Sequence, residues 1–178
     1  MKIFKTIILI ILAIIAVVLI AAFFVNSEYA VEREVTINKP KTEVFEYVKY
    51  LKNQNNYSVW AKMDPDMKKE YLGTDGTVGF ISSWDSDNED VGRGEQEIVK
   101  IDAGKRIDYE LRFYEPYETT DYAYMATEAI NKNGTVVTWG FYGKMDYPMN
   151  LMFLIYDMDE MIGPDLEEGL QSLKEILE

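Results

Sequence analysis

The chain has 178 residues, and its 18 Lys and Arg against 31 Asp and Glu give a formal net charge of −13. It contains no His and no Cys, which excludes His-dependent catalytic triads, thiol nucleophiles, disulfides and zinc–thiolate sites. An acidic chain without a basic stripe is also a poor nucleic-acid binder, because phosphate contacts supply most of that affinity. We therefore expect no nucleic-acid partner, no metal and no cofactor.

The first segment is predicted to be a membrane anchor. All 19 residues from Ile7 to Val25 are apolar, and a helix of that length rises about 28 Å, close to the hydrocarbon thickness of a bilayer. We interpret residues 1–27 as an N-terminal transmembrane anchor. A signal peptide cleaved after Ala22 or Ser27 stays open as the alternative, although its apolar region is usually shorter.

The charges beside this segment predict its orientation. Lys2 and Lys5 precede the span, and only Asn26, Ser27 and Glu28 follow it directly. The positive-inside rule then keeps the N-terminus in the cytoplasm. We expect a single-pass protein of the cell membrane whose C-terminal domain is extracytoplasmic.

Residues 28–178 are predicted to form one domain, because they contain no repeat and no evident linker. A strand is expected over 29–37. Pro40 then suits a first helical turn, and Val44, Phe45 and Val48 recur at helical spacing. The stretch 51–66 looks irregular.

A meander of strands is predicted next, separated by turns rich in Gly, Asp and Asn. Ile107, Tyr109, Leu111 and Phe113 alternate with polar residues, which is typical of an antiparallel sheet with one covered face and places Arg112 on the outer face. The segment 92–94, Gly-Arg-Gly, favours a bulge or a close backbone approach over a phosphate loop. The expected strands are 68–72, 77–84, 92–101, 105–114, 119–130 and 135–143.

The chain is predicted to end in helix after Tyr147-Pro148, kinked or interrupted at Gly163-Pro164, with Asp165 as a cap for the closing turns. This helix is the only apolar partner that the sequence offers to the covered face of the sheet. The fold class is therefore α+β: one curved antiparallel sheet wrapped around a long C-terminal helix.

Several strings in this order resemble the START-like (SRPBCC) superfamily, in particular its polyketide cyclase/dehydrase-type proteins. The resemblance covers nearly all of 28–178 and implies a helix-grip fold with an apolar cavity between sheet and helix. It also implies binding of lipids, sterols, polyketides or other hydrophobic molecules, with cyclisation in a minority of members. The strings are residues 35–40 with Val44-Phe45, 57–60, 78–84 with 92–98, 135–139 and 169–174.

Aromatic and methionine side chains on the strands and the last helix are the candidates for lining such a cavity, with Tyr hydroxyl groups orienting a ligand. The alternative is a filled core in which these rings pack against one another. The candidate ligand-binding residues are Trp84, Tyr109, Leu111, Phe113, Tyr122, Tyr124, Trp139, Phe141, Met152 and Tyr156.

Two acidic clusters invite other interpretations. The loop 85–90 suggests a calcium site, but the sixth and twelfth places of an EF-hand pattern counted from Asp85 hold Asp90 and Gln96, not Gly and Glu. Asp157, Asp159 and Glu160 form the second cluster, in which two carboxylates could act as general acid and base, but helical spacing puts Asp157 and Glu160 on one exposed side. We therefore identify no catalytic residue.

The leading hypothesis is a membrane-anchored domain that binds a hydrophobic small molecule or lipid between the sheet and the C-terminal helix. A cyclase-like enzyme is the second hypothesis, and it requires an inward-facing carboxylate with a raised pKa. The third is an interaction module with a filled core and an acidic surface.

Overall fold

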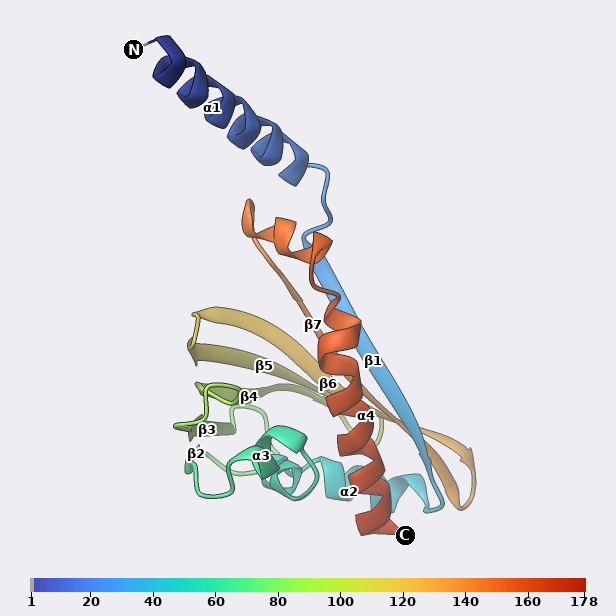
Figure 1. Ribbon diagram of the computed structural model, residues 1–178. Coiled ribbons are helices and arrows are strands. Elements are labelled where there is room, and N and C mark those ends of the chain that lie inside the picture. The colour runs from blue at the N-terminus through green and yellow to red at the C-terminus, as the bar shows by residue number, and fades with distance from the viewer. Residues whose placement is uncertain (1) are drawn as a thin grey trace.

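A computed structural model describes residues 2–178 (Figure 1). Seven antiparallel strands form one curved sheet in the order β1-β7-β6-β5-β4-β3-β2. The elements in chain order are α1 (Lys2–Ala22), β1 (Glu28–Ile37), α2 (Lys41–Val48), η1 (Leu51–Asn56), α3 (Val59–Met63), β2 (Lys68–Leu72), β3 (Ile81–Asp85), β4 (Arg93–Asp102), β5 (Arg106–Glu115), β6 (Thr119–Asn131), β7 (Gly134–Lys144), η2 (Met149–Leu154) and α4 (Met158–Leu177).

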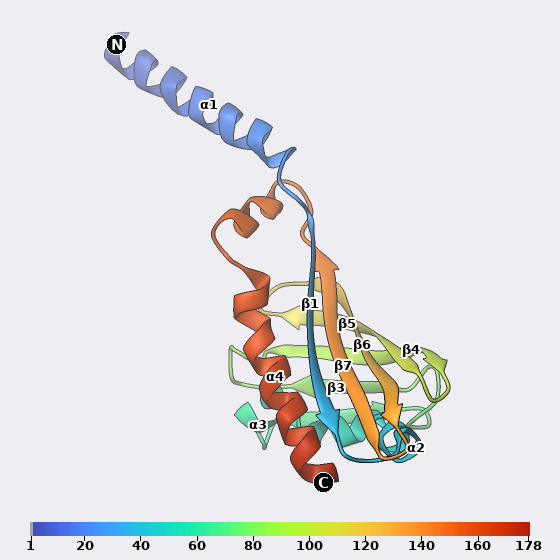
Figure 2. The ribbon, with the colours of Figure 1, turned by 90° about the vertical axis from the view of Figure 1, so that its right-hand side faces the viewer.

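The fold class is confirmed: a curved antiparallel sheet is gripped around a long C-terminal helix, with one apolar helix in front (Figures 1 and 2). Of the described residues, 3–22 form the one helix long and apolar enough to cross a bilayer. It ends at Ala22, so Phe23, Phe24 and Val25 of the expected span lie beyond it in a tight turn.

The α4 helix lies along β1 and covers only part of the concave face (Figure 2). The expectation that the last helix is the only cover of the sheet is therefore wrong. Helix α2 contributes Val44, Phe45 and Val48 to the same core as Leu170 and Leu173 of α4, and it packs against β6 and β7. These two helices fill the part of the concave side that lies nearest the C-terminus.

The start of the last helix differs from the prediction. Residues 149–154 form the 3₁₀ helix η2, and α4 begins only at Met158. Asp157 is the N-cap, since its carboxylate accepts a hydrogen bond from the Asp159 backbone N–H. The cap expected at Asp165 is therefore wrong, and Pro164 lies inside α4 without interrupting it.

Glycines determine two local departures from regular strand. β3 begins at Ile81 instead of residue 77, because Gly76 and Gly79 both adopt positive φ and so form a turn. The predicted bulge at 92–94 is confirmed by a register shift between Arg93 and Gly94. The irregular stretch 51–66 contains η1 and α3.

Candidate functional site

A cavity of about 270 Å³ opens on the concave face of the sheet beside α4. Strands β2 to β7 contribute to its floor, η1, α3 and the first half of α4 cover it, and exposed Asp90 lies at its rim. Polar residues are a minority of the lining, which is Leu51, Gln54, Asn55, Ser58, Trp60, Ala61, Met67, Lys69, Ser82, Ser83, Trp84, Asp90, Val91, Gln96, Leu111, Phe113, Ala123, Trp139, Phe141, Ile162 and Leu166.

Indole rings form much of the cavity wall. All three tryptophans of the chain, Trp60, Trp84 and Trp139, line it, and the rings of Trp60 and Trp139 meet edge to face with centroids 6.2 Å apart. Gly169 of α4 makes room for Trp139, because a Cβ at that position would lie 2.7 Å from the indole Cζ3 atom. Because all three indole rings line the cavity, their fluorescence is expected to respond to what occupies it.

Trp84 is held in place by the bulge in β4. Its indole N–H donates a hydrogen bond to the Val91 carbonyl at 3.2 Å, and its ring meets Phe113 edge to face at 5.8 Å. A Cβ at residue 94 would lie 2.6 Å from the Trp84 ring, so only glycine permits this approach. The Gly-Arg-Gly segment thus shapes the cavity wall.

Gln96 is the unusual polar residue of the site. Its side chain faces the cavity from β4 and is only 7% exposed. Its Nε2 atom is fully buried and has no hydrogen-bond partner among the described residues. An unpaired buried donor costs about 1–3 kcal/mol, so this amide is ready to donate to a ligand oxygen.

Five of the ten candidates from the sequence line this cavity, and five lie elsewhere. Tyr109 is buried in the packed core. Tyr122 stacks on Tyr142, and Tyr124 donates to Glu32, both away from the cavity. Met152 belongs to η2, and Tyr156 follows it in the exposed connection to α4. The five that line it are Trp84, Leu111, Phe113, Trp139 and Phe141.

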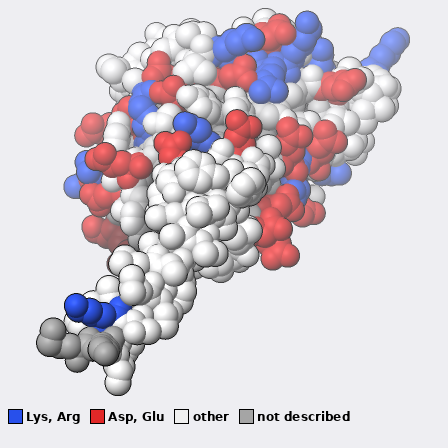
Figure 3. Space-filling model, turned by 90° about the horizontal axis from the view of Figure 1, so that it is seen from above, with Lys and Arg blue, Asp and Glu red and all other residues white. Residues whose placement is uncertain are grey.

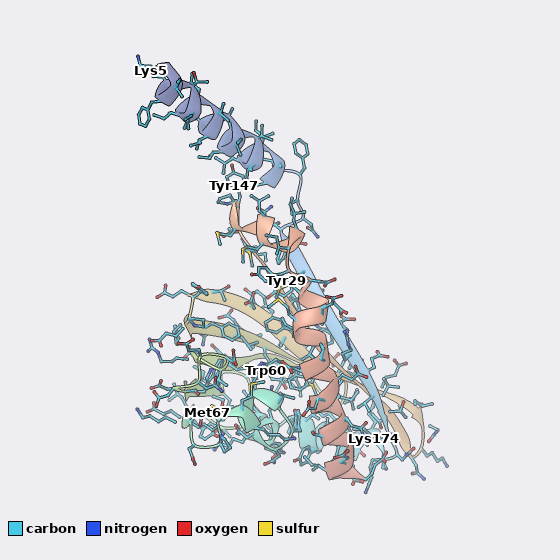
Figure 4. All side chains as sticks on the ribbon, in the orientation of Figure 1. Lys5, Tyr29, Trp60, Met67, Tyr147 and Lys174 are labelled. Carbon is cyan, nitrogen blue, oxygen red and sulfur yellow. The ribbon has the colours of Figure 1, made fainter. Side chains whose placement is uncertain are left out.

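The expected tyrosine hydroxyls are thus missing from the lining, and Gln96 occupies the place of the polar group. Gln96 alternates with Gly94 and Ile98 on the inward face of β4, so a period-two search for inward polar residues would have found it. Trp60 comes from the irregular stretch 51–66 and Met67 directly follows it, and Figure 4 labels both in the region of α3. The string 57–60 contributes to the family resemblance, but without periodicity nothing in the sequence indicated that Trp60 or Met67 lines a cavity.

One carboxylate does face inward, but it does not line the cavity. Asp121 of β6 is 5% exposed, and desolvation by burial raises its pKa, opposed by hydrogen bonds from Tyr29 and Thr119. Burial first, and then the charge of Asp121, raise the pKa of Tyr29. The pair lies next to Phe141 and the η2 segment, where it supports the sheet and is separate from the cavity lining.

The other charged candidates are held in local contacts. Arg112 binds Glu95, Glu97 and Glu110 on the outer face of the sheet, as the alternation predicted. Asp159 pairs with Arg33 of β1 at 2.7 Å. Within residues 2–178, no three His, Cys, Asp or Glu side chains are grouped so that they could hold a metal ion.

No protein-family model matches the sequence, and neither does any curated protein sequence. Solved structures do match its fold. A truncated norcoclaurine synthase from Thalictrum flavum is similar over 84% of this chain and 92% of its own, with a TM-score of 0.62 at 11% identity.

Two further structures have the same architecture. The Aha1 protein of Colwellia psychrerythraea matches 84% of this chain and 96% of its own, with a TM-score of 0.54 and 13% identity. Ara h 8.0201 matches 84% of this chain and 97% of its own, with a TM-score of 0.52 and 13% identity. Together with the seven-stranded sheet and long C-terminal helix, these likenesses show that the chain has a Bet v1-like, helix-grip fold.

Proposed function

We propose that this protein is a membrane-anchored START-like domain that binds a small hydrophobic molecule, or the apolar part of a lipid, in the cavity between the sheet, α3 and α4. The observation that carries the proposal is a largely apolar hollow of about 270 Å³ that contains a single buried, unpaired amide. One of the similar structures, a norcoclaurine synthase mutant, was solved with a transition-state analogue. Concave, mostly apolar pockets with a small number of polar groups are the usual small-molecule sites.

The volume limits the size of the ligand. A dry apolar cavity of about 150 Å³ accepts a benzene molecule, and drug-sized ligands occupy roughly 300–1,000 Å³. The present cavity of about 270 Å³ suits a compound of one or two rings or a short acyl segment. Burial of its surface supplies the affinity, at about 25 cal/mol per Å², and a hydrogen bond from the Gln96 Nε2 group to one acceptor oxygen of the ligand supplies the orientation.

The anchor keeps this site at the membrane surface. Helix α1 is apolar throughout residues 7–22, and the segment after it is built into the domain: Ala22 is buried, and its carbonyl accepts a hydrogen bond from Asn150. A segment held in this way supports retention of α1 over cleavage. A domain of net negative charge is repelled by anionic lipid surfaces, so local presentation or sensing fits this protein better than transport between membranes.

The test uses the full chain in nanodiscs and exploits the three cavity tryptophans. Heavy-atom probes quench indole fluorescence on contact, so 6-bromo-2-naphthol is expected to quench saturably. Ala123 lies on the cavity floor, and Ala123→Leu fills part of the space. This variant is expected to lose the saturable quenching, whereas Ala129→Leu, at an exposed position of the same strand, keeps it.

Equal quenching of the wild type and Ala123→Leu would mean that the probe reaches the tryptophans without entering the cavity, and the ligand-binding proposal would fail. The topology is tested separately by a reporter fused after Glu178. We expect activity outside the cytoplasm, and cytoplasmic activity would overturn the proposed orientation.

A further inference from the structure

Apolar side chains are exposed at the end of the domain that adjoins α1. We call this set the end patch; its members are Phe23, Phe24, Tyr147, Met149, Leu154 and Ile155. Phe24 is 86% and Ile155 77% exposed, and the other four are exposed as well. Large apolar side chains gathered in this way on a soluble surface mark an interaction site.

The end patch lies in a gap in the charge of an otherwise acidic domain. Residues 147–156 contain no charged side chain, and the neighbouring Asp146 pairs with Lys144 at 2.9 Å. Figure 3 shows the same gap: uncharged surface continues from α1 onto the adjoining end of the domain, and acidic and basic side chains surround it. A partner for this surface must therefore be apolar.

Direct contacts fix the end patch to the end of α1. The Asn150 side-chain amide donates to the carbonyls of Ala22 at 2.8 Å and Val25 at 3.0 Å. The rings of Phe23 and Tyr147 stack with centroids 4.5 Å apart, and Figure 4 shows Tyr147 beside the end of α1. The Met145 backbone N–H also bonds to the Ser27 carbonyl. The linker is thus held against the domain along its length.

We propose that the end patch inserts into the interfacial layer of the bilayer that α1 spans, so that the domain is docked on the membrane in one orientation. This inference rests on the proposed retention of α1 as an anchor. If α1 ends in the bilayer, the contacts of Asn150 and Phe23 bring η2 to the same level. Aromatic rings with a polar tip, such as Tyr147, are typical of that layer, and an uncharged surface avoids the cost of desolvating ions there.

The absence of cysteine in the natural chain allows single-site labelling. We would place a nitroxide spin label at Ile155→Cys in the full chain in nanodiscs, and at Ile176→Cys as the matched control. Both positions are exposed isoleucines, Ile155 just before α4 and Ile176 in its last turn, and residue 176 lies at the opposite end of the domain from α1 (Figure 1). Collisions with lipid-soluble oxygen and with a water-soluble nickel chelate measure the depth of each label.

We expect the label at residue 155 to collide more with oxygen and less with the chelate than the label at residue 176. Equal accessibility at the two sites, with the chain still co-floating with the lipid, would overturn docking while leaving the anchor intact. Dipolar broadening of the spectrum from the label at residue 155, if it disappears when labelled chains are diluted, would show that two chains pair there. That result would overturn membrane docking and assign the end patch to a second copy of the chain. Failure of the chain to co-float would overturn the proposed anchor itself.

Discussion

Two parts of the concave face are built from the same kinds of residue, but one part is packed and the other borders a cavity. Near the C-terminus, Val137 of β7 packs under α2 and α4, with Leu170 and Leu173 fully buried. Farther across the sheet, Leu111 and Phe113 of β5 also face inward, but they border the cavity and stay half-buried. Both regions have apolar residues at alternate positions, so the pattern does not separate a filled core from a hollow one.

The difference lies in what covers each part. Helix α4 lies along β1. The Arg33 side chain of β1 approaches Gly163 of α4, and its guanidinium pairs with Asp159 of the same helix. A Cβ at residue 163 would lie 2.0 Å from that guanidinium, so the helix is positioned at the β1 edge by a contact that leaves no space for a side chain. The strands β3 to β5 lie away from the β1 edge and are covered by η1, α3, loops and the Ile162 and Leu166 side chains of α4, which together leave a cavity.

The largest effect is expected in the packed part. Leu170→Ala removes a side chain that is 1% exposed and should lower the free energy of unfolding by about 3–5 kcal/mol, because it leaves a cavity that dense packing cannot close. Chemical denaturation of the full chain in detergent, followed by near-UV circular dichroism, measures the loss. Ile176→Ala, at an exposed site on the same helix, should change stability by about 0.5 kcal/mol or less; equal losses would contradict the packed core.

The same truncation beside the cavity should cost less. Leu111→Ala removes a half-buried side chain from the cavity wall, so we expect a loss of about 1–2 kcal/mol, since fewer contacts disappear and no new enclosed void forms. The same denaturation experiment gives the value. A loss as large as that of Leu170→Ala would mean that the wall is packed and the hollow absent.

The parts that sequence reasoning predicted are those governed by local periodicity. Alternation in 107–113 gave the covered face of β5, and the glycine pair at 92 and 94 gave the bulge. The cavity lining depends on contacts between distant segments, such as Trp60 with Trp139, which periodicity does not encode. Helix α4 begins only at Met158 because Asp157 caps it. The apolar residues before Asp157 continue the helical pattern, so the pattern alone did not predict this start.

Within the cavity, Gln96→Leu should separate ligand orientation from ligand burial. The variant removes an unpaired buried donor, so stability is expected to stay equal or rise by about 1 kcal/mol. The wild type is expected to bind 6-bromo-2-naphthol about fivefold more tightly than 2-bromonaphthalene because of one hydrogen bond, and the variant is expected to lose this preference. Tryptophan quenching titrations measure both affinities. Gln54→Leu, which alters a half-buried glutamine of the same lining, should keep the preference; its loss in both variants would assign the effect to general polarity.

The smallest effect is expected at Asp121, beside the cavity. Because burial raises its pKa above the usual 3.8, the folded chain keeps this proton to a higher pH than the unfolded chain does. Stability contributed by the protonated form is therefore complete below about pH 4 and is lost as pH rises through the folded-state pKa. Asp121→Asn does not titrate, and its amide oxygen can still accept the Tyr29 hydroxyl. The difference in unfolding free energy between wild type and variant should thus fall with rising pH and then become constant, whereas a difference independent of pH would show that Asp121 ionises as freely in the folded chain as in the unfolded one.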